Sequence, residues 1–76
     1  MTPRYELTWW QHDDDELAGQ VDLDVGPQDV MDAFGLHEVP VNCLLVGPDQ
    51  VCFVERVSSI VVDLAAYAYT VDAYRN

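Results

Sequence analysis

Two stretches near the N-terminus, residues 4–11 and 17–25, alternate between apolar and polar side chains. A period of two is typical of β-strands that bury one face and expose the other. Between them lies a short polar segment, residues 12–16, whose aspartates are typical of a hairpin loop. The pattern therefore predicts an antiparallel hairpin. The side chains expected to share its outward face are Glu6, Thr8, Trp10, Gln20, Asp22 and Asp24.

A helix is predicted directly after the hairpin, beginning near Pro27 and ending at Gly35. Proline suits the first helical position because its missing N–H needs no partner there. Asp29 places a negative charge at the positive end of the helix dipole, and glycine is common just beyond the last helical turn. The residues predicted to face the core are Val30, Ala33 and Phe34.

The same junction returns further along the chain, where residues 46–51 resemble residues 25–30. The likeness fades on both sides, so we interpret it as shared junction chemistry, in which a strand end is followed by glycine and proline, rather than as a duplicated unit. It predicts a strand over 41–46 and a second helix over 48–57, which Ser58 and Ser59 end. The residues predicted to face the core are Val51, Val54 and Val57.

Residues 60–74 fit two patterns, because their apolar positions recur at both helical and strand spacing. The β-branched and aromatic content of this stretch favours a strand, and we expect Tyr67, Tyr69 and Tyr74 to pack in the core and between strands. The element order is then β-β-α-β-α-β. It predicts an α+β fold with two short helices on one face of a small single-layer sheet, antiparallel or mixed.

The chain is strongly acidic, with 14 Asp and Glu against three Arg and no Lys, and its formal net charge is -11. Half of its residues are hydrophobic, which argues against a disordered acidic tail and for one folded domain, 1–76. Residues 1–38 hold ten of the acidic residues and one arginine, so the charge belongs largely to the half with the hairpin. Such a field repels phosphates and attracts cationic surfaces. We therefore expect a basic protein partner and no direct binding of nucleic acid.

Catalytic and metal-binding motifs are not recognisable in the sequence. There is no nucleophile motif and no glycine-rich phosphate loop, so we expect no enzyme activity, no catalytic residues and no cofactor. Residues 13–16 are consecutive acids whose alternate side chains point apart, and we expect a solvated loop rather than a metal site. Cys43 and Cys52 show no metal-like grouping with His12 or His37, and we expect both to be buried apolar thiols. The alternative, in a secreted protein, is a single disulfide between them.

Two absences bear on the compartment. No apolar run approaches the ~18–20 residues of a membrane span, and residues 1–10 lack the basic-then-apolar pattern of a signal peptide. We therefore expect a cytoplasmic protein that makes no contact with a membrane.

The outward face of the predicted hairpin is the candidate binding surface. It would place Trp10 among carboxylates, and an aromatic anchor ringed by polar groups is typical of an interface hot spot. Carboxylates also accept the paired N–H groups of arginine. Alternatively, a neighbouring strand or the C-terminal segment covers Trp10. With the acidic loop included, the predicted partner-binding residues are Glu6, Thr8, Trp10, Asp13, Asp14, Asp15, Glu16, Asp22 and Asp24.

Short motifs follow one another along most of the chain. After the early hairpin come Phe34-Gly35-Leu36 at the end of residues 30–36, Gly47-Pro48-Asp49-Gln50, and Asp63-Leu64 leading into Tyr67-Ala68-Tyr69. This layout resembles that of small, acidic, uncharacterised bacterial domain proteins of immunity-protein type. The resemblance implies that the protein neutralises a partner protein, and it implies no catalytic residues.

Three functions agree with these features. The favoured hypothesis is a stoichiometric inhibitor or immunity-like protein whose acidic hairpin neutralises a basic partner such as a toxin. The second is a DNA-mimic regulator of a nucleic-acid-binding protein, which requires carboxylates at phosphate-like spacing. The third is a halophilic structural homodimer, joined through an exposed strand edge, whose acidity serves solubility and meets no charged target.

Overall fold

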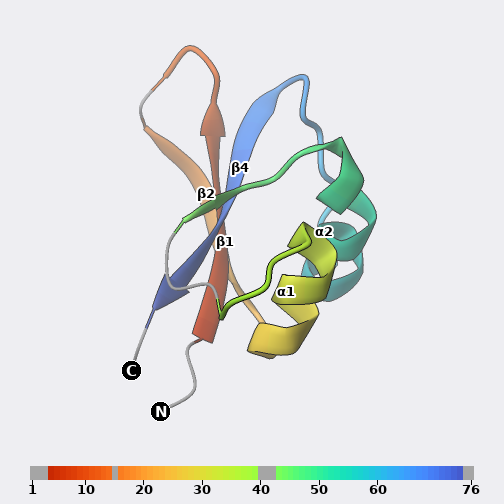
Figure 1. The fold of residues 1–76 in the computed structure, drawn as a ribbon. Coiled ribbons are helices and arrows are strands. Elements are labelled where there is room, and N and C mark those ends of the chain that lie inside the picture. Colours follow the sequence, from red (N-terminus) through yellow and green to blue (C-terminus); the bar gives the residue numbers. More distant parts are fainter. Residues whose placement is uncertain (1–3, 15, 40–42, 75–76) are drawn as a thin grey trace.

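The computed structural model describes residues 4–14, 16–39 and 43–74, and its fold is α+β (Figure 1). The strands lie side by side in the order β2-β1-β4-β3, and each neighbouring pair is antiparallel. The predicted order β-β-α-β-α-β is confirmed. The elements are β1 (Arg4–Gln11), β2 (Leu17–Leu23), α1 (Pro27–Phe34), β3 (Leu44–Leu45), a 3-10 turn η1 (Pro48–Gln50), α2 (Val51–Ser58) and β4 (Tyr67–Tyr74).

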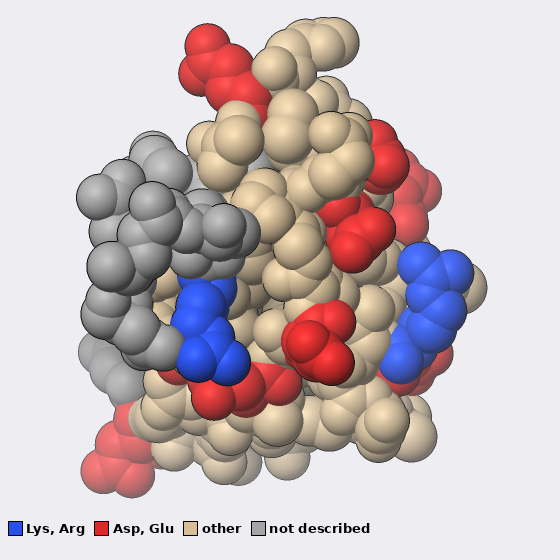
Figure 2. All heavy atoms as spheres, turned by 90° about the horizontal axis from the view of Figure 1, so that it is seen from below, with Lys and Arg blue, Asp and Glu red and all other residues tan. Residues whose placement is uncertain are grey.

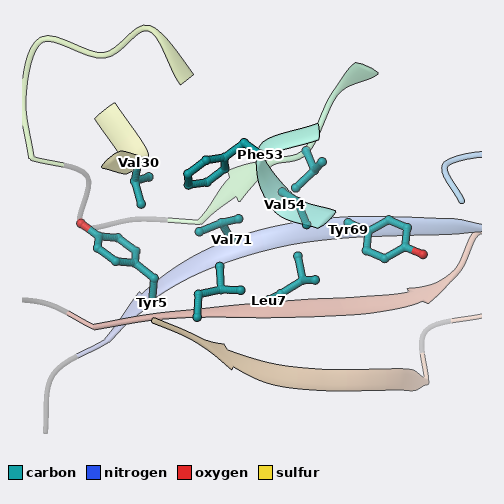
Figure 3. Packing of buried hydrophobic residues seen from close by; sticks show 9 residues of the cluster. Tyr5, Leu7, Val30, Phe53, Val54, Tyr69 and Val71 are labelled. Carbon is teal, nitrogen blue, oxygen red and sulfur yellow. The ribbon is translucent and has the colours of Figure 1, made fainter. Parts of the chain in front are cut away.

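Both helices cover the same face of the sheet, and the core lies between them and the strands (Figure 3). The alternation in the sequence explains which side chains enter it, because the odd-numbered residues of β1 and β4 point toward the helices. From the helices, Val30 and Val54 are completely buried, and Phe53 is buried beside them. The buried strand residues are Tyr5, Leu7, Leu23, Tyr69 and Val71.

The two glycine–proline junctions, predicted to share one chemistry, also share one hydrogen-bonded form. The Gly26 N–H donates to Asp29 Oδ2 (3.3 Å), and the Gly47 N–H donates to Gln50 Oε1 (3.0 Å). In each case the side chain of the third helical residue accepts a bond from the residue before the helix. At the other end of α1, Gly35 has a φ of 66°, the left-handed conformation that glycine adopts without strain.

Several predicted boundaries are corrected by the structure. β2 ends at Leu23 rather than at residue 25, because the chain leaves the sheet there to reach α1. The strand predicted over 41–46 is described only as Leu44–Leu45; residues 41 and 42 lie outside the described residues, and Val46 still donates its N–H to the Tyr69 carbonyl (3.0 Å). The helix predicted over 48–57 begins as the turn η1 and ends at Ser58.

The prediction of buried cysteines is wrong, since both thiols are free and both residues are exposed. Cys52 lies one position before the buried Phe53 on α2, so the helical turn directs it away from the sheet. Cys43 lies just before β3 and two positions before Leu45, so both side chains point to the same side of the sheet, away from the helices.

Candidate protein-binding surface

The sheet has a second face, opposite the helices, that no described helix covers (Figure 1). We call it the open face. The strand registers place on it the even-numbered residues of β1 and β4, the residues of β2 that are paired with those of β1, and the outward residue of β3. Its members are Arg4, Glu6, Thr8, Trp10, Leu17, Gln20, Asp22, Leu45, Ala68, Thr70, Asp72 and Tyr74.

A row of carboxylates crosses the middle of the open face. Glu6 is the direct partner of Asp22 on one side and of Asp72 on the other, so β2, β1 and β4 each contribute one acid. Neighbouring strands lie ~4.8 Å apart, which brings these side chains within mutual reach. Like charges in directly opposed positions repel each other, and a cation placed over the row would relieve that repulsion.

Hydroxyl groups stabilise the two ends of the row. The Thr8 hydroxyl donates to Asp72 Oδ2, and the Tyr74 hydroxyl reaches across β1 to donate to Asp22 Oδ1 (2.9 Å). Among the described residues, the central Glu6 carboxylate has no hydrogen-bond or ion-pair partner. The acid in the middle of the row therefore keeps its carboxylate oxygens free of hydrogen bonds from the other described residues, although its side chain is half-buried.

The same carboxylates change the acidity of two neighbours. The hydrogen bond to Asp22 raises the pKa of Tyr74, and the nearby negative charge adds to this effect. Burial raises the pKa of the Cys43 thiol, with a further contribution from a hydrogen bond to Asp72. Because thiolates rather than thiols are nucleophiles, the raised pKa lowers the reactivity of Cys43 at neutral pH.

The structure brings together most, but not all, of the predicted binding residues. Glu6, Thr8 and Asp22 adjoin one another on the open face, whereas Asp24 lies beyond the end of β2 and outside this face. Trp10 lies on the open face near the hairpin loop and is half-buried, beside Ala68 of β4. It is therefore neither sealed in the core nor fully exposed.

The acidic loop forms the tip of the hairpin, at one end of the sheet. Asp13, Asp14 and Glu16 are exposed, as predicted, and Asp15 lies outside the described residues. The Asp14 carboxylate accepts the Glu16 N–H (2.9 Å), and His12 Nε2 bonds to the Leu64 carbonyl (2.9 Å). In the described part of the chain, no group of His, Cys, Asp and Glu is arranged to hold a metal ion.

The sequence interpretation missed the contribution of β4. Thr70, Asp72 and Tyr74 alternate in the sequence with the buried residues, but nothing local indicates that β4 lies next to β1. Tyr69 packs in the core as predicted, with its ring 5.9 Å from that of Trp9. Tyr74 instead lies on the open face and joins the carboxylate row.

A shallow hollow of about 260 Å³ lies between the two helices, lined by Asp29, Asp32, Ala33, Phe53 and Arg56. The Arg56 guanidinium lies over the Phe53 ring, 5.9 Å from its centroid, so a cation of the protein itself already contacts the aromatic wall. Figure 2 shows acidic side chains spread over this end of the molecule, with arginines among them. On the open face, by contrast with this end, three acids form a single row across neighbouring strands.

No protein-family model matches the chain, and no curated protein matches its sequence. Within the part that the structure describes, neither helix has the length and apolar character needed to cross a lipid bilayer. The arrangement of the open face is therefore the basis on which we infer function.

Proposed function

We propose that the protein is a small acidic protein-binding domain of immunity-protein type, which neutralises a basic partner such as a toxin by binding it stoichiometrically. The observation that carries this proposal is the row of Asp22, Glu6 and Asp72 across an uncovered sheet face. Its acids come from β1 and β2 and from β4, whose sequence positions are far apart, so the row exists only in the folded protein.

Electrostatics support a cationic partner. The net charge is -11, and the carboxylates of the open face can accept arginine N–H groups in pairs. Complementary fields raise association rates toward ~10⁸–10⁹ M⁻¹s⁻¹ at low salt, which is useful for an inhibitor that must capture a toxin quickly. Trp10, half-buried at one end of the face, offers an aromatic contact beside the charges.

The size of the molecule also supports one principal partner. The described residues expose 4947 Å², and a standard interface takes ~800 Å² from each protein, about a sixth of that area. An interface of this size leaves room for one principal partner on so small a molecule. Complete masking of a toxin's active cleft then requires one copy of the protein for each copy of the toxin.

The proposal is tested by genetic rescue. A library of genes from the source genome is screened for products that stop the growth of a host alone but not together with this protein. The rescued gene is then tested with the triple variant Glu6→Gln, Asp22→Asn, Asp72→Asn, which keeps the shape of the row and removes its charge. We expect the variant to lose rescue.

The matched control is Asp29→Asn, Asp32→Asn, Asp49→Asn, which removes the same number of charges from exposed positions off the open face. It should rescue as well as the wild type. Equal rescue by both variants would show that the open face is not the binding surface. A rescued product that binds nucleic acid without being a toxin would instead favour the DNA-mimic function.

A further inference from the structure

β2 forms an edge of the described sheet. It pairs with β1 on one side, and no described strand pairs with its other side. In an antiparallel sheet, each residue directs its N–H and C=O to the same side, and the side alternates from one residue to the next. One known hydrogen bond between two strands therefore tells, for every residue of the paired strands, toward which neighbouring strand its backbone N–H and C=O point.

The bond between Val46 and Tyr69 supplies that direction. The Tyr69 carbonyl accepts the Val46 N–H (3.0 Å) and so points toward β3. Asp72 lies three positions further along β4, so its backbone N–H and C=O point toward β1, where its partner is Glu6. The backbone N–H and C=O of Leu7, the next residue in β1, point the opposite way, toward its partner Val21 in β2. The neighbours of Val21, whose backbone groups therefore point away from the sheet, are Gln20 and Asp22.

The side chains along this free edge differ between the two faces of the sheet. Gln20 and Asp22 are exposed on the open face. On the helix side lies Val21, which is half-buried. The bulge in the pairing of β1 with β2 sets Leu17 opposite Trp10, on the open face, where its large apolar side chain is 56% exposed. A strand added beside residues 20–22 would thus meet Gln20 and Asp22 on the open face and the apolar Val21 on the other face.

We propose that β2 binds an extended segment of the basic partner by strand addition. The backbone groups of Gln20 and Asp22 supply the hydrogen bonds, as exposed sheet edges do for added peptides. The segment that fits alternates cationic residues, directed to the open face beside Asp22, with apolar residues beside Val21 on the other face. This inference rests on the proposed function and specifies how its partner is recognised.

A second copy of the chain fits this edge less well. Residues 5–55 contain no Lys or Arg, so β2 and its flanks offer no cation to the carboxylates of a copy. An antiparallel pair of β2 strands would bring Glu16, Asp22 and Asp24 near the same acids of the copy. Like charges across an interface are unfavourable, whereas a basic segment turns these acids into attractive contacts.

The test uses a peptide as long as β2, seven residues, in which arginine and valine alternate. Two further versions carry N-methyl groups, one on every arginine and the other on every valine. All three have the same charge. In an added strand, only one alternate set of N–H groups faces β2, so one methylated version should bind at least ~10-fold more weakly than the other two. The unmodified peptide should also slow amide exchange at Gln20 and Asp22 by at least ~10-fold.

Each contrary result overturns the inference without deciding the proposed function. Equal binding of all three peptides would show that charge alone holds them and that no strand is added, and the proposed role of the open face would still be decided by genetic rescue. No binding of the unmodified peptide at ~1 mM would exclude strand addition, while genetic rescue tests the function separately. Protection of Gln20 and Asp22 in the protein alone, together with a dimer in sedimentation, would assign the edge to a second copy.

Discussion

Replacement of Gly19 by alanine is expected to destabilise the protein, because the indole of Trp9 lies directly over this glycine. A Cβ at position 19 would lie 2.1 Å from Trp9 Cζ2 and 2.3 Å from Cε2, whereas ordinary contacts are 3.4–4 Å. The ring must therefore move by more than ~1 Å. Its movement is opposed by Tyr69, whose ring centroid lies 5.9 Å away and whose hydroxyl accepts the Asp63 N–H (3.0 Å).

Overpacking of this kind costs ~1–3 kcal/mol, a large part of the ~4–11 kcal/mol expected for a chain of this length. Urea unfolding followed by tryptophan fluorescence measures the loss. With a slope of ~1 kcal/mol per M, the midpoint should fall by ~1–3 M.

The matched control is Gly26→Ala, where an added Cβ meets nothing within 4 Å and φ is -90°. At this position alanine is a poorer helix cap than glycine, which lowers the free energy of unfolding, but it also restricts the unfolded chain, which raises it. Each effect is ~0.5–1 kcal/mol, so the stability should change little. An unchanged midpoint for Gly19→Ala, or equal losses in the two variants, would refute the packing of Trp9 over Gly19.

Three further outcomes are expected. Gly35→Ala should cost ~1 kcal/mol in the same assay, because alanine is strained at a φ of 66°. Asp22→Asn should lower the pKa of Tyr74, followed by NMR of its ring, because the carboxylate that favours the neutral phenol is removed. The folded protein holds this proton more tightly than the unfolded chain, so the contribution of the pair to stability is complete below about pH 10 and is lost as the pH rises through the raised pKa. Asp72→Asn should accelerate alkylation of Cys43 at pH 8, measured by mass spectrometry of its peptide, and an unchanged rate would contradict the contact between them.

Patterns within short segments of the sequence predicted the strands of the hairpin and the starts of the helices, which depend on neighbouring residues. The alternation in β1 predicted which of its faces is buried, and the bounds of this strand, Arg4–Gln11, are those expected. Glycine and proline marked the helix junctions because their conformational limits act within one turn. The predicted hairpin already put Glu6 and Asp22 on one face, so two of the three acids of the row were visible in the sequence.

The remaining features depend on contacts between distant segments. Asp72 completes the row only because β4 pairs with β1, a pairing that no local pattern specifies. Phe53 was not predicted to be buried, because α2 begins after a 3-10 turn with three residues per turn, which changes the phase of the helical face. Asp24 was assigned to the open face because alternation continues in the sequence beyond the point where β2 leaves the sheet.

The central claim is that the carboxylates of the open face attract and bind a basic protein. The most direct test measures the association rate between the protein and the partner found by genetic rescue, over a series of salt concentrations. The wild type and the Asp29, Asp32, Asp49 variant should associate rapidly at low salt and lose at least ~10-fold in rate by physiological salt. The Glu6, Asp22, Asp72 variant should associate slowly, with little dependence on salt. Equal rates for all three proteins, or a wild-type rate that salt does not change, would contradict the claim.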